Sequence, residues 1–72
     1  MEEFDIVELV NDFQSGYEEV GTIPAGTRGV IVFIHEGERD FEVELFDKTT
    51  KNTVSVETIN VAQLKLIHKN KQ

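Results

Sequence analysis

The sequence has no cysteine and no tryptophan, and it has a single proline and a single tyrosine among its 72 residues. Without cysteine there is no disulfide framework and no thiolate metal site, so a small core must be stabilised by packing alone. No apolar run approaches the roughly 20 residues of a membrane span. The N-terminus also lacks the basic start of a signal peptide. These absences predict a cytoplasmic protein that does not enter a membrane.

The length of the chain limits what it can do. It has room for one domain, and a domain of this size buries only about 60% of the surface that its unfolded chain exposes. The hydrophobic content of 39% and the charged content of 29% are those of an ordinary folded domain. A reactive pocket with several positioned groups is hard to hold on so small a scaffold. We therefore expect one domain over 1–67, a polar C-terminal tail over 68–72, and a protein that is not an enzyme.

Basic residues are scarce in the first two thirds of the chain. Residues 1–47 carry thirteen acidic side chains against two arginines, a net charge of −11, whereas 48–72 carry five lysines against Glu57, a net charge of +4. An anionic surface repels phosphate backbones and favours a basic partner, although net negative charge also serves solubility.

Glycine, proline and asparagine divide the chain into short apolar runs, which is typical of an all-β domain. We expect strands at 5–10, 29–35, 40–47, 53–58 and 64–67, and a single helical turn at 60–63; for the first of these a short helix is the rival assignment. The polar segment 11–27 is expected to be a long loop. It ends in a predicted type I turn over 23–26, with Pro24 second and Gly26 fourth.

The strongest local signal is a hairpin between 29–35 and 40–47, with a two-residue type II′ turn at Gly37 and Glu38. This register places apolar residues opposite one another on one face: Ile34 with Phe41, Val32 with Val43, and Val30 with Leu45. A second hairpin with its loop at 47–52 would continue that face by pairing Leu45 with Val54 and Val43 with Val56. The predicted core therefore contains Val32, Val43, Leu45, Val54 and Leu64.

Three stretches carry a resemblance to a known family: 23–32 (IPAGTRGVIV), 41–45 (FEVEL) and 61–64 (VAQL). Together they resemble a family of small bacterial SH3-like proteins classed as a domain of unknown function, over about residues 5–67. The resemblance implies an all-β fold, a small five-stranded SH3-like barrel with a long first loop and a single helical turn before the last strand. It also implies an interaction or immunity-type accessory role. The matching positions are turn glycines and core aliphatics, so no catalytic residue is carried over.

Few residues suggest chemistry. His35, Glu36 and Glu38 resemble a metal-ligand cluster, but a strand end and a tight turn place them on different sides. Glu42 and Glu44 lie on an open strand face with no cleft to raise the pKa of either carboxyl, as acid-base catalysis needs. We expect no catalytic residue, no metal and no cofactor. The groove of tryptophan and tyrosines that binds proline-rich peptides is also absent.

The outer face of the central strands is the predicted binding surface. In the registers above, three apolar side chains point outward among three acidic ones: Ile31, Phe33 and Phe46 with Glu42, Glu44 and Glu57. An apolar centre with a charged rim is the anatomy of a protein interface. We therefore expect a protein-interaction module, such as an immunity, antitoxin or regulatory accessory protein, that binds a basic protein as a monomer or weak homodimer. The alternative is that the first loop, through Tyr17 or Val20, covers these side chains and completes a second small core.

A nucleic-acid-associated barrel is the second function that the sequence allows. It would use the basic residues of the second hairpin loop and the tail: Lys48, Lys51, Lys65, Lys69 and Lys71. Affinity for phosphates comes from clustered lysine and arginine, and most of the surface here is acidic. The charge distribution therefore favours a protein partner over nucleic acid.

Overall fold

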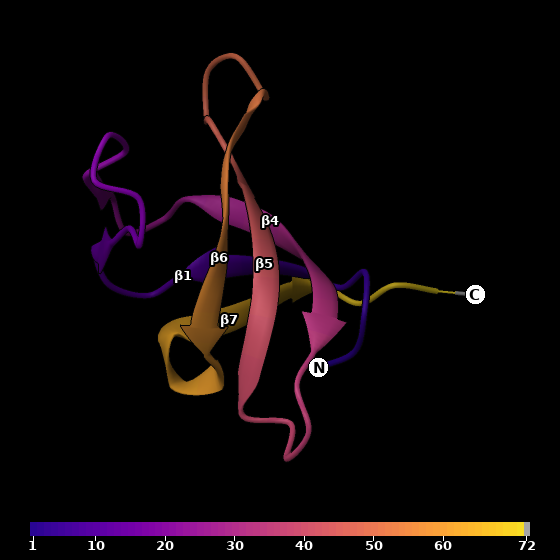
Figure 1. Ribbon diagram of the computed structural model, residues 1–72. Coiled ribbons are helices and arrows are strands. Elements are labelled where there is room, and N and C mark those ends of the chain that lie inside the picture. Colours follow the sequence, from indigo (N-terminus) through magenta and orange to yellow (C-terminus); the bar gives the residue numbers. More distant parts are fainter. Residues whose placement is uncertain (72) are drawn as a thin grey trace.

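The computed structural model describes residues 1–71, which form an almost entirely β-structure (Figure 1). The elements are β1 (Ile6–Leu9), β2 (Phe13–Gln14), β3 (Thr22–Ile23), β4 (Arg28–Ile34), β5 (Asp40–Phe46), β6 (Thr53–Asn60), the 3₁₀ turn η1 (Val61–Gln63) and β7 (Leu64–His68). The predicted all-β fold with one helical turn before the last strand is confirmed. Asn60 caps that turn, because its side chain accepts a hydrogen bond from the Ala62 N–H at 3.0 Å.

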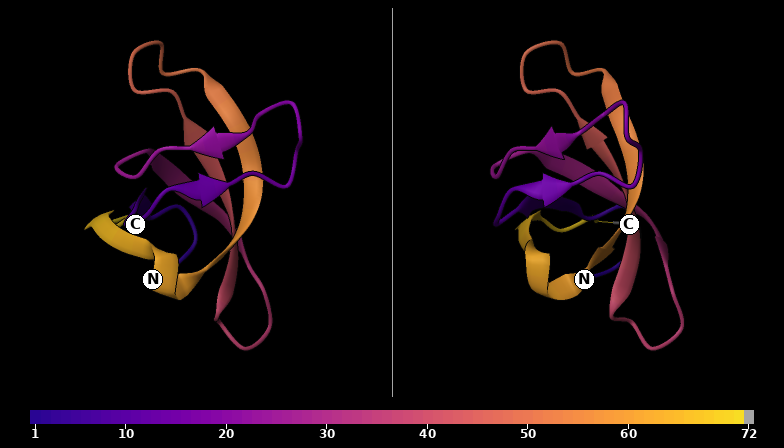
Figure 2. Two further views of the ribbon diagram at one scale, coloured as in Figure 1. Left: turned by 90° about the vertical axis from the view of Figure 1, so that its left-hand side faces the viewer. Right: turned by 60° about the vertical axis from the view of Figure 1, so that its left-hand side comes forward.

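Five of the strands form one antiparallel sheet in the order β6-β5-β4-β1-β7. The first strand therefore lies in the middle, between β4 and the last strand. The sheet is strongly curved (Figure 2). Its two edge strands, β6 and β7, do not pair with each other within the described residues, so hydrogen bonds do not close the sheet into a barrel.

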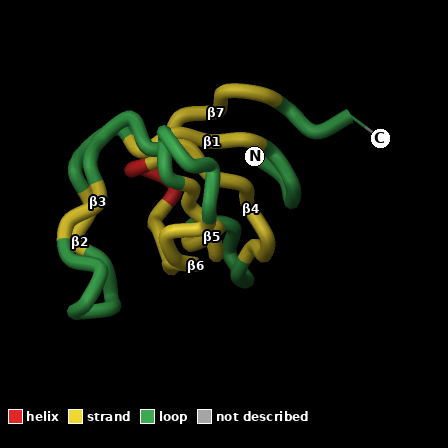
Figure 3. Tube along the Cα trace, turned by 90° about the horizontal axis from the view of Figure 1, so that it is seen from above, coloured by secondary structure: helices red, strands yellow, loops and turns green. Residues whose placement is uncertain are grey.

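The predicted long loop holds a small hairpin of its own, formed by β2 and β3, which projects beyond the main sheet (Figure 3). The turn that follows it spans Pro24–Thr27, since the Thr27 N–H donates to the Pro24 carbonyl at 3.2 Å. Gly26 is third in this turn and has φ +87°. A type II turn requires this left-handed conformation in its third position, so the predicted type I turn over 23–26 is wrong by one residue.

The first long hairpin has the predicted register only near its turn. Ile34 lies opposite Phe41 and Phe33 opposite Glu42, but the register shifts at Val32, and Ile31 lies opposite Val43. The predicted pairs Val32 with Val43 and Val30 with Leu45 are therefore wrong. A β-bulge of this kind inserts one extra residue into one strand, which exchanges the two faces beyond it.

The turn of this hairpin also differs from the prediction. The His35 N–H donates to the Asp40 carbonyl at 3.0 Å, and the Glu38 N–H donates to the His35 carbonyl at 3.0 Å. Gly37 and Glu38 have φ +92° and +56°. The connection is therefore a four-residue loop over 36–39 with two left-handed residues, and not a two-residue type II′ turn.

The second hairpin contains another register shift. Its loop at 47–52 is confirmed, and β6 continues to Asn60. The shift lies between Leu45 and Phe46, so Leu45 pairs with Ser55 and Val43 with Glu57. The predicted pairs Leu45 with Val54 and Val43 with Val56 are wrong by one residue.

The core lies on the concave side of the sheet and contains Val7, Leu9, Ile23, Ile31, Phe41, Val43, Leu45, Ile59 and Leu64. Of the predicted core residues, Val43, Leu45 and Leu64 are confirmed, whereas Val32 and Val54 are only partly buried. Gly29 permits the close approach of β4 to β5, because a Cβ at this position would lie 2.5 Å from the Glu44 carbonyl oxygen.

The two ends of the described chain are held together by Asp5. Its buried carboxylate accepts hydrogen bonds from the backbone N–H groups of Glu2 at 2.8 Å and Asn70 at 2.7 Å. Lys69 forms an ion pair with Glu2 at 2.9 Å. The segment predicted as a free polar tail from 68 is therefore tied to the N-terminus through residue 70. No helix within residues 1–71 is long and apolar enough to cross a membrane.

Candidate interaction surface

The outer face of β4, β5 and β6 carries an apolar and acidic surface. Phe33 lies opposite Glu42, which lies opposite Thr58, and Glu44 lies opposite Val56. Phe33 is 50% exposed and Val56 is 40% exposed. We refer to these five residues as the outer surface. It retains Phe33, Glu42 and Glu44 from the prediction and gains Val56 and Thr58.

Hydrogen bonds hold the two glutamates of the outer surface in place. Glu42 Oε2 lies 2.6 Å from His35 Nε2 and accepts a hydrogen bond from Thr58 Oγ1 at 2.6 Å. The interaction with His35 and the bond from Thr58 lower the pKa of the Glu42 carboxyl and outweigh the opposing effect of burial. Glu44 accepts a hydrogen bond from Thr53 Oγ1 at 2.5 Å. Hydrogen bonds therefore fix the orientation of both carboxylates on this surface.

An aromatic contact links His35 to the outer surface. The rings of His35 and Phe33 meet edge to face, with their centroids 5.1 Å apart. The sequence placed His35 in an exposed turn beside Glu36 and Glu38. In the structure it instead lies beside Glu42. No group of three or more His, Cys, Asp or Glu residues within 1–71 is placed to hold a metal ion.

Three of the predicted surface residues lie elsewhere. Ile31 is 0% exposed and belongs to the core, because the bulge at Val32 turns it to the inner face. Glu57 is 4% exposed, because the shift in β6 places it opposite Val43 on the inner face. Phe46 is partly buried and lines hollows beside the second hairpin loop. The predicted outward orientation of Ile31 and Glu57 is therefore wrong.

Glu57 anchors the small hairpin. Its carboxylate accepts hydrogen bonds from Ser15 Oγ at 2.5 Å, Ser55 Oγ at 2.6 Å and the Gly16 N–H at 2.9 Å. Burial alone would raise the pKa of Glu57, but these bonds outweigh it and hold the pKa below its ordinary value. A carboxylate from β6 thus joins two segments that are far apart in sequence.

The first loop leaves Phe33 open to solvent, although Tyr17 and Val56 line one groove. The small hairpin lies beside β6 on the side of Glu57 (Figure 2). Val20 and Phe13 pack against the main core, and Tyr17 remains 51% exposed. The loop thus completes the main core and leaves half of Phe33 in contact with solvent.

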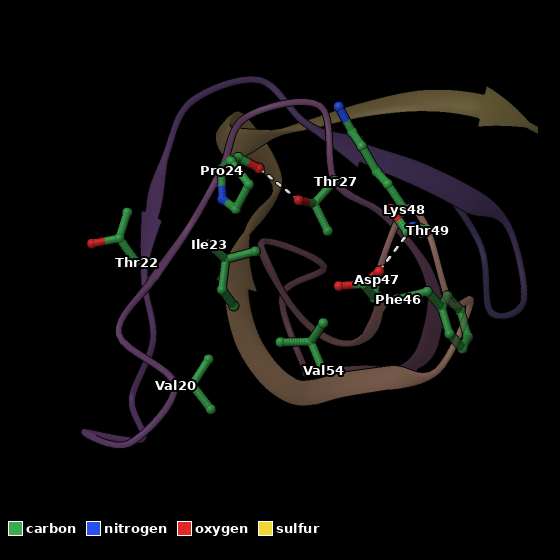
Figure 4. A pocket seen from close by; sticks show the side chains of 10 residues that line it. All are labelled: Val20, Thr22, Ile23, Pro24, Thr27, Phe46, Asp47, Lys48, Thr49 and Val54. Carbon is green, nitrogen blue, oxygen red and sulfur yellow. Dashed lines mark hydrogen bonds between the residues drawn. The ribbon is translucent and has the colours of Figure 1, made fainter.

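A hollowed region lies between the small hairpin and the second hairpin loop. A cavity of about 260 Å³ is lined by Ile23, Pro24, Phe46, Lys48 and neighbouring residues (Figure 4). A hollow of about 630 Å³ shares Phe46 and Lys48 with it and adds Arg28 and Lys51. This hollow also contains Glu8 and Asp47, and Arg28 pairs with Glu8 at 3.2 Å.

One of three comparisons with known proteins found a match. Residues 3–66 match the family described as Domain of unknown function (DUF4926). The comparisons with curated proteins and with solved structures found no match.

Proposed function

The chain belongs to the DUF4926 family, whose description names no activity, and from its surface we propose that it is a non-enzymatic protein-interaction module that binds a basic partner in the cytoplasm. The observation that carries this proposal is the exposure of Phe33 at 50% beside the fixed carboxylates of Glu42 and Glu44. An immunity, antitoxin or regulatory accessory protein would need such a surface.

The fold supports a binding role. The strand order β6-β5-β4-β1-β7, with one 3₁₀ turn before the last strand, supports an SH3-like architecture for the chain. Such a sheet presents one face to the core and leaves the other open to a partner. Its strands, rather than mobile loops, position the binding side chains, which favours a rigid and preformed surface.

Charge and apolar contact have separate roles in this proposal. The net charge of −7 and the two glutamates attract a basic partner before contact and raise the association rate, an effect that salt screens. Phe33 supplies the apolar contact at the centre, where a buried aromatic ring slows dissociation. Each role predicts a different kinetic defect when its residues are changed.

The test measures the binding kinetics of the basic protein that co-purifies with the chain from its native host, at low and high salt. The double variant Glu42→Lys with Glu44→Lys should slow association at least about tenfold at low salt. Phe33→Ala should mainly speed dissociation. The control, Glu3→Lys with Glu18→Lys, changes the net charge equally at exposed positions outside the outer surface. Equal association rates for the two double variants would refute the proposal.

A second candidate function is nucleic-acid binding through the hollow beside Phe46. The supporting observation is that Lys48 and Lys51 line one hollow with Phe46, a combination that suits phosphate contact and base stacking, whereas Arg28 in the same hollow pairs with Glu8. Two of the tail and strand lysines are less available, because Lys69 pairs with Glu2 and Lys65 lies opposite Glu8. A mobility-shift assay in which Lys48→Ala with Lys51→Ala abolishes binding, while the Glu42 and Glu44 reversals have no effect, would favour this candidate.

A further inference from the structure

One edge of the sheet has unpaired backbone groups. The Val61 N–H donates to the Arg39 carbonyl at 2.7 Å, at the end of the ladder between β5 and β6. Every second pair of an antiparallel ladder is hydrogen-bonded, so the pair Val43 and Glu57 is bonded through the backbone. The N–H and C=O groups of Val56 and Thr58 therefore point away from β5. Within residues 1–71 these groups have no other hydrogen-bond partner.

The free edge of β6 is protected against strand pairing only by the bulge near its start and by the inward-turned Glu57. Proteins also protect exposed edges with lysine, proline or very short strands. The eight residues of β6 include no proline and no basic residue, and the only charged side chain, Glu57, turns inward. The opposite edge strand, β7, carries Lys65 and His68 in five residues. The two edges are therefore protected to different degrees.

A groove runs beside this edge. It has a volume of about 430 Å³ and lies between Phe13 and Tyr17 of the small hairpin and Val56 and Thr58 of β6. The hydrogen bonds from Ser15 and Gly16 to Glu57 hold the hairpin at the spacing that forms the groove. Phe13, Tyr17 and Val56 share the lining of this groove with the polar side chains of Gln14, Glu42, Glu57 and Thr58. A groove beside unpaired backbone groups matches the way in which protein domains bind extended peptides by strand addition.

The charge around this edge indicates which kind of segment can bind there. Glu42 lies opposite Thr58 and Glu44 opposite Val56, one strand in from the edge. An added strand would lie about 10 Å from β5, a distance that a lysine and a glutamate side chain span together. A second copy of the chain would bring another net charge of −7 and a second pair of these glutamates to the same place. The edge therefore suits a basic segment and repels its own copy.

We propose that β6 binds an extended basic segment of the partner as an additional antiparallel strand, with backbone hydrogen bonds to Val56 and Thr58. Alternate side chains of that segment point to opposite faces. Its basic residues lie over Glu42 and Glu44, and the residues between them enter the groove beside Tyr17. This inference rests on the proposed function and adds to it the form in which the partner binds.

Hydrogen exchange of the intact protein, measured by NMR, tests strand addition directly. The probe is a blocked seven-residue peptide of alternating lysine and valine, and the control probe has the same sequence with alternate backbone nitrogens methylated. At saturation the probe should slow exchange of the Val56 and Thr58 amides at least about tenfold. The Glu57 amide is already bonded to β5 and should change little. The methylated probe should bind more weakly and give no slowing.

A pair of proline variants tests the same contact by mutation. Val56→Pro removes an N–H that has no internal partner, so the fold should remain and binding of the probe should weaken at least about tenfold. The matched control is Leu66→Pro on β7, the other edge strand, which should bind the probe as the unchanged protein does. Melting temperatures establish that both variants fold. The exchange measurement on the unchanged protein decides the question if either does not.

The readouts separate failure of this inference from failure of the proposed function. Chemical-shift changes at Phe33, Glu42 and Glu44 without slower exchange at Val56 and Thr58 would overturn strand addition and leave the outer surface as the binding site. An absence of shifts at all of these residues with millimolar probe would overturn both. Slower exchange that depends on protein concentration, without any probe, would show that a second copy occupies the edge and would also overturn the inference.

Discussion

Replacing Glu57 by glutamine tests the anchor of the small hairpin. The carboxylate is 4% exposed and accepts three hydrogen bonds, from Ser15, Ser55 and Gly16. Glutamine has nearly the same shape but no charge. Its NH₂ group is a hydrogen-bond donor, and it would face the hydroxyl and N–H donors that now bind the carboxylate. The substitution therefore leaves the packing in place and weakens the bonds.

The expected loss of stability follows from these contacts. A hydrogen bond to a charged group contributes about 1.5–3 kcal/mol, and roughly twice as much as a neutral one. The amide oxygen of glutamine still accepts one bond, and water from the neighbouring groove satisfies part of the rest. We expect Glu57→Gln to lower the free energy of unfolding by about 2–4 kcal/mol at neutral pH. The control Glu44→Gln, on the open face with one bond from Thr53, should lower it by less than about 1 kcal/mol.

The difference in stability between the original protein and Glu57→Gln should decrease in acid. The pKa of Glu57 in the folded protein lies below its ordinary value of 4.5. A carboxyl with a lowered pKa stabilises the fold fully above its ordinary pKa, and that stability is lost as pH falls through the folded pKa. The difference in the free energy of unfolding between the original protein and Glu57→Gln should therefore be largest near pH 7 and should decrease as the pH falls below about 4.5.

Urea unfolding from pH 7 down to pH 2 measures this gap. Asp5, Glu42 and Asp47 also have lowered pKa values, so both proteins should lose stability in acid, and only the difference between them reports on Glu57. Equal unfolding midpoints for the original protein and Glu57→Gln at pH 7 would refute the anchoring role. A gap that stays constant down to pH 2 would refute the electrostatic origin of the effect.

Four further substitutions test the fold. Ile31→Ala should cost about 2–5 kcal/mol in urea melts and Val32→Ala about 1 kcal/mol or less, because the bulge buries Ile31 and leaves Val32 partly exposed; the reverse order would restore the predicted register. Gly29→Ala should lower the free energy of unfolding by about 1–3 kcal/mol, because its Cβ would lie 2.5 Å from a backbone oxygen of β5. An unchanged melting temperature would contradict the close approach of β4 to β5. Asp5→Ala should cost about 2–4 kcal/mol and speed exchange of the Asn70 amide, which loses its acceptor; unchanged exchange would show that the ends are not joined there.

The sequence was sufficient to predict the strands of the main sheet, but not their register or the small hairpin of β2 and β3. Alternation of apolar and acidic residues over 40–47 predicted β5, and the helical turn predicted at 60–63 is η1 with its capping residue. The pairing rule that fixed the register assumed regular ladders in which apolar residues face one another. Each long hairpin instead contains one bulge, and each bulge moves the pairs beyond it by one residue. No turn residue marks Val32 as the extra residue, since it sits within a continuous β-forming run.

The same shifts explain which part of the binding surface could be predicted. Phe33 and Glu42 lie between the turn and the first bulge, so their predicted place on the outer face was right. Ile31 lies beyond that bulge and Glu57 depends on the register of β6, and both were placed on the wrong face. Ser15 is 42 positions from Glu57 in sequence, and no local pattern connects them.

The register of β6 decides both the surface and the groove beside it. In the regular ladder, Val56 would enter the core and Glu57 would lie outside with Glu42 and Glu44, an arrangement that buries more apolar area and no charge. The observed shift instead turns Glu57 inward, where three donors from the small hairpin and β6 compensate the cost of burying a carboxylate. It also leaves Val56 exposed at 40% along an unpaired edge. One extra residue in β6 therefore fixes the small hairpin against the sheet and exposes Val56 beside an unpaired edge, which is the combination that the proposed strand addition uses.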